Sequence, residues 1–154
     1  MTTDREPVLT GGCQCGAVRY ALYAEPAAAS ICHCRMCQKA MGNLFSASAS
    51  VPRKEFAWTA GAPATWQSSQ IAERGFCQQC GTPLSFRYLT GEQISVSTGS
   101  LDEPARAKPT AQIGIESKVP WLEEALGLPG KTTEENAADA LAGMKNLQHP
   151  DREA

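Results

Sequence analysis

The sequence has no strong charge of one sign and no long apolar run. Its 154 residues carry 14 Lys and Arg against 16 Asp and Glu, a net charge of −2, so no basic field is available to neutralise a phosphate backbone. No uninterrupted apolar stretch approaches the roughly 18 to 20 residues of a membrane-spanning helix, and residues 1–5 lack the apolar segment of a signal peptide. We therefore expect a soluble cytoplasmic protein with no nucleic-acid partner and no membrane attachment.

Length and composition favour one globular domain over residues 1–154. Domains most often contain about 100 to 150 residues, which leaves little room for a second one. Hydrophobic residues make up 42% of the chain and charged residues 19%, an ordinary globular balance rather than a disordered one.

Short segments with period-two alternation, separated by turn residues, predict a mainly β core. The expected strands are residues 18–23, 44–50, 84–88 and 93–97, with weaker candidates at 55–58, 64–67, 71–76 and 112–115.

Helices are also expected beside these strands, including a short one over residues 121–126. Residues 34–41 contain good helix formers, and Gly42 is placed to end the helix. Residues 132–147 carry apolar side chains at helical intervals, and Thr132 with Glu135 has the spacing of a capping box. This C-terminal amphipathic helix would either pack on its own sheet or form a partner surface.

Seven cysteines in tight clusters are the unusual feature of the chain. They occur as Cys13-x-Cys15, Cys32-x-Cys34-x-x-Cys37 and Cys77-x-x-Cys80. An odd number of clustered cysteines without an export signal favours metal ligation over disulfides. The spacing is typical of zinc, with iron as the main competitor. The alternative, buried structural cysteines plus a redox pair, leaves the clustering unexplained.

Four of the cysteines suggest one closed site. On a strand, Cys13 and Cys15 would point to the same face and could hold one ion together. Cys77 and Cys80 supply two more thiols in a knuckle, where Gly81 permits a tight turn. The two pairs complete a four-cysteine structural zinc site that links distant parts of the chain.

The remaining thiols, Cys32, Cys34 and Cys37, are one ligand short of a tetrahedron, as in catalytic zinc sites. His33 lies between two ligands spaced i and i+2, so we expect its side chain to leave on the opposite face and to be buried or hydrogen-bonded. Three thiolates leave a net negative centre, which suits a thiol better than water as the group to be activated. The site therefore points to chemistry that makes or breaks a carbon–sulfur bond.

Four segments resemble the glutathione-dependent formaldehyde-activating enzyme family, which also includes centromere protein V. They are residues 11–20 (GGCQCGAVRY), 32–40 (CHCRMCQKA), 74–81 (RGFCQQCG) and 116–121 (ESKVPW). The resemblance implies a β-tent zinc-binding fold with short helices. A domain of this type would span residues 8–130, followed by a C-terminal helical extension over residues 131–154.

The resemblance also implies two zinc ions per chain. One would be structural, on Cys13, Cys15, Cys77 and Cys80, and the other catalytic, on Cys32, Cys34 and Cys37, which is the partition that the spacing suggests. The implied activity is that of a carbon–sulfur lyase of the S-(hydroxymethyl)glutathione synthase type, which joins glutathione and formaldehyde reversibly. A small thiol such as glutathione is then the expected partner, with a homodimer as a further candidate association.

Glutathione carries two carboxylates, so its site should offer cations. The candidates in or beside the matching motifs are Arg35, Lys39, Lys118 and Arg74, each of which could equally be a solvated surface charge. Family members often have a histidine after a late proline, where this sequence has Gln112. The alternative function is a non-catalytic, zinc-stabilised protein-interaction scaffold, and redox sensing by the same cysteines ranks below both.

Overall fold

The structure is a computed structural model that describes residues 5–152, and strands dominate it. The strands in this described part are β1 (Leu9–Gly12), β2 (Arg19–Leu22), β3 (Ala28–Cys32), β4 (Ser46–Pro52), β5 (Phe56–Ala60), β6 (Ala64–Ser69), β7 (Ala72–Phe76), β8 (Pro83–Tyr88), β9 (Gln93–Ser97) and β10 (Ala111–Ile113). Short 3-10 turns are η1 (Arg53–Glu55), η2 (Thr98–Ser100), η3 (Pro104–Arg106) and η4 (Ile115–Ser117). The prediction of a mainly β fold is confirmed; the β-tent name stays a prediction.

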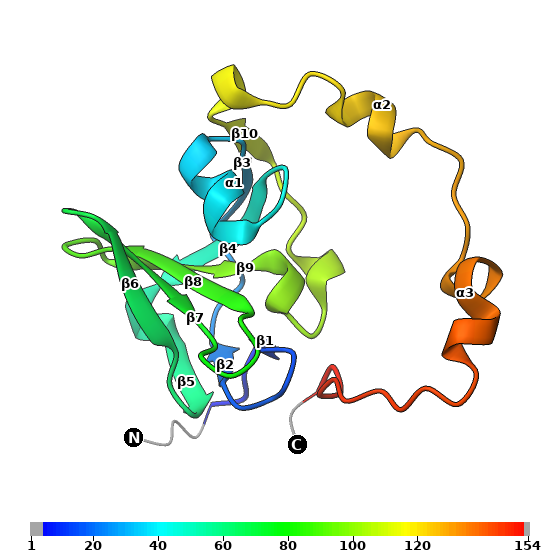
Figure 1. Ribbon diagram of the computed structural model, residues 1–154. Coiled ribbons are helices and arrows are strands. Elements are labelled where there is room, and N and C mark those ends of the chain that lie inside the picture. Colours follow the sequence, from blue (N-terminus) through cyan, green and yellow to red (C-terminus); the bar gives the residue numbers. More distant parts are fainter. Residues whose placement is uncertain (1–4, 153–154) are drawn as a thin grey trace.

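The strands form two sheets (Figure 1). The smaller has the order β1-β2-β5, and the larger has the order β10-β3-β4-β9-β8-β7-β6. All neighbours pair antiparallel except β10 and β3, which are parallel. Each expected strand overlaps an observed one, whereas the sequence did not predict β1 and β3. Those two strands are rich in Gly, Ala and Ser, which have weak strand propensity.

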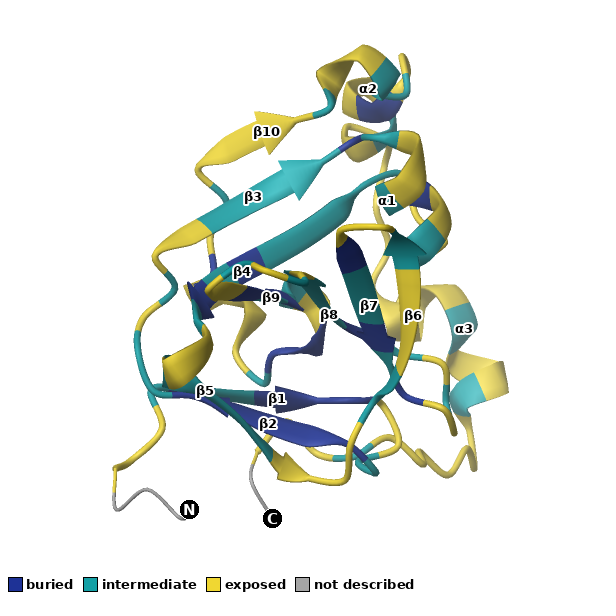
Figure 2. Cartoon of the chain, turned by 90° about the vertical axis from the view of Figure 1, so that its left-hand side faces the viewer, coloured by how far each residue is buried: buried dark blue, intermediate teal, exposed yellow. Residues whose placement is uncertain are grey.

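The hydrophobic core lies between the two sheets (Figure 2). Tyr20 and Leu22 of β2 pack in one cluster with Ala49 and Val51 of β4 and with Val96 of β9, and all five side chains are buried. Because successive side chains of a strand point to opposite faces, the serines that alternate with these residues lie on the other face of the larger sheet. That second face forms the cavity described below.

Helix α1 (Arg35–Met41) confirms the first expected helix. The side chain of Cys34 accepts a hydrogen bond from the amide of Cys37 at its start, and Gly42 ends it in the left-handed conformation. Helix α2 (Leu122–Leu126) is a single short turn that buries Leu122.

Helix α3 (Thr133–Leu141) is shorter than expected. The capping box of Thr132 and Glu135 is present, but the backbone is already non-helical at Ala137 and leaves the helix at Ala142. Of the two alternatives for this helix, packing on its own sheet is wrong, because α3 contains no buried residue and lies away from the strands (Figure 1). Its apolar stripe is too short, and too rich in alanine, to bury much surface.

Beyond α3 the chain returns to the body of the protein. The amide of His149 donates to the carbonyl of Gln14 at 2.8 Å, next to the first cysteine pair. Within residues 5–152, no helix has the length and apolar character needed to cross a membrane.

Candidate metal centres and the adjoining cavity

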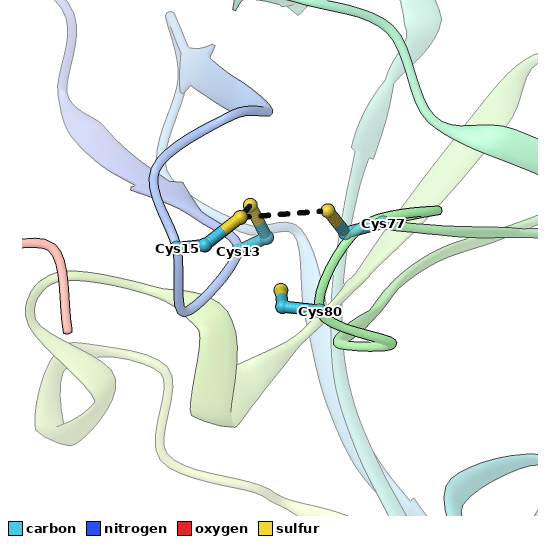
Figure 3. Close-up of side chains that lie close together, drawn as sticks. All are labelled: Cys13, Cys15, Cys77 and Cys80. Carbon is cyan, nitrogen blue, oxygen red and sulfur yellow. Dashed lines mark hydrogen bonds between the residues drawn. The ribbon is translucent and has the colours of Figure 1, made fainter. Parts of the chain in front are cut away.

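Two loops bring four thiols together (Figure 3). Cys13 and Cys15 follow β1, while Cys77 and Cys80 lie between β7 and β8. All four Sγ atoms lie within 4.8 Å of one another, with 3.6 Å from Cys13 to Cys15 and 3.8 Å from Cys15 to Cys77. Zinc–sulfur bonds of about 2.3 Å in a tetrahedron place the sulfurs about 3.8 Å apart. The donor set and its spacing therefore fit a closed zinc site.

The first pair reaches this position by a turn, not by a strand. The expectation that Cys13 and Cys15 share a strand face is wrong, because β1 ends at Gly12 and the next residues form a turn. Within that turn, the amide of Gly16 donates to the carbonyl of Cys13 at 3.0 Å. The turn directs both thiols toward the second loop.

The second pair forms the expected knuckle. The amide of Gly81 donates to the carbonyl of Cys77 at 2.9 Å, and Gly81 has φ +80°, a conformation that other residues rarely adopt. Burial raises the pKa of the Cys80 thiol, but hydrogen bonds from the hydroxyl and amide of Thr82 and from neighbouring groups outweigh it and lower the pKa to about 6. The hydrogen bonds from Thr82 thus favour the thiolate form of Cys80, which is the form that binds a metal.

A second cluster joins the end of β3 to the start of α1. The Sγ atoms of Cys32, Cys34 and Cys37 lie within 4.8 Å of one another. Burial raises the pKa of Cys34, yet hydrogen bonds from the amide and thiol of Cys37 and from neighbouring groups bring it below its usual value. Burial is also the main reason that the pKa of Cys32 rises to about 12. Three converging thiols, one short of a tetrahedron, fit a zinc ion with an open position.

His33 points away from the three thiols that surround it in the sequence. Its ring is fully buried, packs against Phe45, and donates from Nε2 to Oε1 of Gln112 at 2.9 Å. Gln112 lies on β10, whose next residue, Ile113, lines the cavity instead. Gln112, at the position where the resemblance led us to expect a histidine, therefore faces His33 and not the cavity.

Two backbone contacts hold the cysteine segment against β10. The amide of His33 donates to the carbonyl of Ile113 at 2.9 Å. Gly114 then passes so close that a Cβ atom there would lie 2.7 Å from the amide nitrogen of Cys34.

Gln38 is a site residue that the sequence analysis missed. Its buried side chain donates to the carbonyl of His33 at 2.7 Å and to that of Ser117 at 2.9 Å, and its Oε1 accepts from Arg35. It therefore clamps α1 onto the strand that carries Cys32. No pattern of spacing marks it, because both acceptors are backbone atoms.

A cavity of about 840 Å³ adjoins the three-thiol cluster. Cys32, Cys34 and Cys37 are part of its wall. Large apolar side chains form much of the rest, and they are Met36, Met41, Trp66, Ile71, Phe76, Phe86, Tyr88 and Ile113. Such a hollow, with a reactive group in its wall, has the size of a ligand site.

Serines form the floor of the cavity. Ser46 is the direct cross-strand neighbour of Cys32, and Ser48 lies opposite Ser97. The hydroxyls of Ser50 and Ser95 form a hydrogen bond of 2.8 Å. The sequence has Ser at alternate positions of two expected strands, which is a signal for this floor. Only the pairing of β4 with β9 shows that the two rows of serines lie side by side.

The cations divide between two hollows. Arg74 is the one Lys or Arg that lines the large cavity among the described residues, with Nη2 at 3.6 Å from Sγ of Cys37 and its guanidinium over the ring of Phe86. Arg35, Lys39 and Arg74 together line an adjoining hollow of about 400 Å³.

Lys118, the remaining cation expected at the ligand site, is placed differently. Its Nζ atom pairs with Oε1 of Glu123 at 2.6 Å, and it lines neither hollow. The structure therefore brings three of the four candidate cations together and leaves Lys118 apart.

Comparison with known proteins shows what the chain is similar to. The model of the family described as "Glutathione-dependent formaldehyde-activating enzyme" matches residues 8–117. An "uncharacterized lyase" of Schizosaccharomyces pombe is 31% identical over 86 residues, which are 56% of this chain and 62% of the yeast protein. A crystal structure of a Rhodobacter sphaeroides protein has the same fold, with a TM-score of 0.54 at 22% identity, over 67% of this chain and 98% of that one.

Proposed function

The chain belongs to the glutathione-dependent formaldehyde-activating enzyme family, and on that basis we propose that it is a zinc-dependent carbon–sulfur lyase. It would act on the adduct of a small thiol with an aldehyde, of the glutathione and formaldehyde type. The observation that carries the proposal is the set of three thiols in the wall of a ligand-sized cavity. A closed structural site would not need such a cavity.

Cys32, Cys34 and Cys37 would hold the reactive zinc, and Cys13, Cys15, Cys77 and Cys80 the structural one. When bound at the three-thiol site, zinc supplies an open coordination position at which a thiol loses its proton and stays nucleophilic.

The residues of the chain orient the reactants. Gln38 fixes α1, and with it Cys37, against β3. Arg74 is placed to donate to the oxygen of the aldehyde or to a carboxylate of the thiol, because its guanidinium lies next to Cys37. Arg35 and Lys39 in the adjoining hollow supply further positive charge for an anionic thiol such as glutathione.

The reaction is a simple addition. In the synthetic direction, sulfur forms a bond to the carbonyl carbon, the π electrons of the C=O bond move to oxygen, and the proton lost from sulfur ends on that oxygen. In the lyase direction the carbon–sulfur bond breaks and the same proton returns to sulfur.

Cobalt-substituted protein tests the proposal. A thiol that enters the open position adds a fourth sulfur, so we expect a saturable change in the visible absorption when glutathione is added. Arg74→Gln should weaken the response to glutathione by about tenfold or more, because a hydrogen bond to a charged group is lost. Lys118→Gln is the matched control, since it removes another of the candidate cations, one that lines neither hollow.

The alternative is a zinc-stabilised interaction module. The observation that favours it is the exposed apolar side chains after η4, which are Trp121, Leu126, Leu128, Met144 and Leu147. If no thiol perturbs the cobalt spectrum, the lyase proposal fails and this alternative takes its place.

A further inference from the structure

We propose that the carbon half of the substrate is a bulky, uncharged alkyl or aryl aldehyde rather than formaldehyde alone, an inference that rests on the proposed lyase function. Formaldehyde adds one carbon to a thiol. The cavity beside the three thiols has a volume of about 840 Å³, which lies within the range of volumes of sites that bury a drug-sized molecule.

The chemistry of the lining indicates what the extra volume takes. Trp66, Ile71 and Tyr88 are more than half exposed in the described chain, with 63%, 64% and 54% of their surface accessible, and all three line the cavity. When an apolar group covers such side chains, their apolar surface is removed from water, which is favourable. An alkyl chain or an aromatic ring is therefore the matching ligand.

The floor adds a requirement for neutrality. Ser46, Ser48 and Ser97 present hydroxyl groups, and Arg74 is the one cationic side chain among the described residues that line this cavity. No Asp or Glu lines the cavity in that part of the chain. Hydroxyl groups bond a neutral carbonyl or alcohol oxygen well, but they do not replace the ions that a highly charged group needs.

Each hollow suits one half of the substrate, the smaller one the thiol and the larger one the carbon group. The smaller hollow, with Arg35 and Lys39, shares Arg74 and Trp66 with the larger one. An anionic thiol can then place its carboxylates near these cations while the carbon group extends over the serine floor. The addition itself is unchanged, because the substituent on the carbonyl carbon takes no part in it.

Stable thioethers test the inference without turnover. Calorimetry on the full zinc-loaded chain should show that S-hexylglutathione binds at least about tenfold more tightly than S-methylglutathione, because each fully buried methylene contributes about fourfold. Ser48→Leu, which fills the floor, should remove most of that preference.

A pair of exposed isoleucines provides the control for folding and for non-specific apolar binding. Ile71 and Ile115 are both 64% exposed, but only Ile71 of the two lines the cavity. Ile71→Ser should reduce the preference for the hexyl ligand about fourfold or more, and Ile115→Ser should leave it unchanged.

Three results overturn the inference. Equal affinities for the methyl and hexyl ligands would exclude a bulky carbon group but leave the lyase proposal intact. Equal effects of Ile71→Ser and Ile115→Ser on the preference for the hexyl ligand would exclude binding of that group in the cavity, again without affecting the lyase proposal. If neither thioether binds and glutathione leaves the cobalt spectrum unchanged, the lyase proposal itself fails.

Discussion

Substitution of one thiol in each cluster should separate the two sites by stability. We compare Cys80→Ser with Cys34→Ser in zinc-loaded protein. Sixty-one residues separate Cys15 from Cys77, so an ion at the four-thiol site closes a long loop between β1 and β7. By analogy with a disulfide, closing a loop of this length is worth about 4 kcal/mol, whereas the short loop from Cys32 to Cys37 is worth about 2 kcal/mol.

These values translate into melting temperatures. For a domain of this size, 1 kcal/mol corresponds to a shift of about 2 to 4 °C, so Cys80→Ser should lower Tm by about 8 to 16 °C and Cys34→Ser by about half as much. Circular dichroism melts measure the shift, and elemental analysis of the same samples should show one zinc ion lost in each variant. Cys34→Ser should also abolish the cobalt response to thiols, because its cluster lines the cavity.

Two results would refute this reasoning. If the two substitutions lower Tm equally, the four-thiol site is not the principal crosslink of the fold. If the protein still melts cooperatively at an unchanged temperature after complete chelation, metal binding supplies no folding free energy, contrary to what is expected of a structural site.

Two further predictions concern polar contacts of the buried residues Arg19 and His33. Asp102 accepts hydrogen bonds from Arg19 and Thr10, and although burial opposes it, these bonds hold the pKa of the carboxyl below its usual value. Asp102→Asn should lower the free energy of unfolding by about 3 kcal/mol at neutral pH in urea unfolding, because the buried Arg19 loses its counter-ion. A carboxyl with a lowered pKa stabilises the fold above about pH 4, and this contribution is lost as the pH falls further. The difference in stability between the two proteins should therefore narrow below that pH, and a difference that widens would contradict the role given to Asp102. Gln112→Leu removes the acceptor of His33 and should lower the free energy of unfolding by about 1 to 2 kcal/mol. Gln112→Glu keeps an acceptor and should lower it less. If both variants lose the same stability, the hydrogen bond contributes nothing.

The sequence alone determined the local chemistry of this protein. The spacing of the cysteines is a property of the chain, so it defined the two groups of thiols before any fold was known. Strongly alternating segments such as residues 93–97 predicted their own strands, and helix α1 followed from its residues and from Gly42. In each case the cause lies within a few residues.

Other features depend on contacts between distant segments. β3 begins with Ala28, Ala29 and Ser30, which have weak strand propensity, and it forms because β4 and β10 pair with it. Conversely, the expected C-terminal helix is cut short at Leu141 because no sheet surface buries its apolar side chains.

The cavity was decided entirely by tertiary structure. Arg74 was one of four candidate cations in the sequence, and only the position of β7 brings it to Cys37 while Lys118 pairs with Glu123 elsewhere. The serines of β4 and β9 become one floor because the register places Ser48 opposite Ser97. The sequence thus determined which atoms could bind a metal, since ligand type and local spacing suffice for that. The shape and polarity of the cavity required the register between strands, which no local pattern specifies.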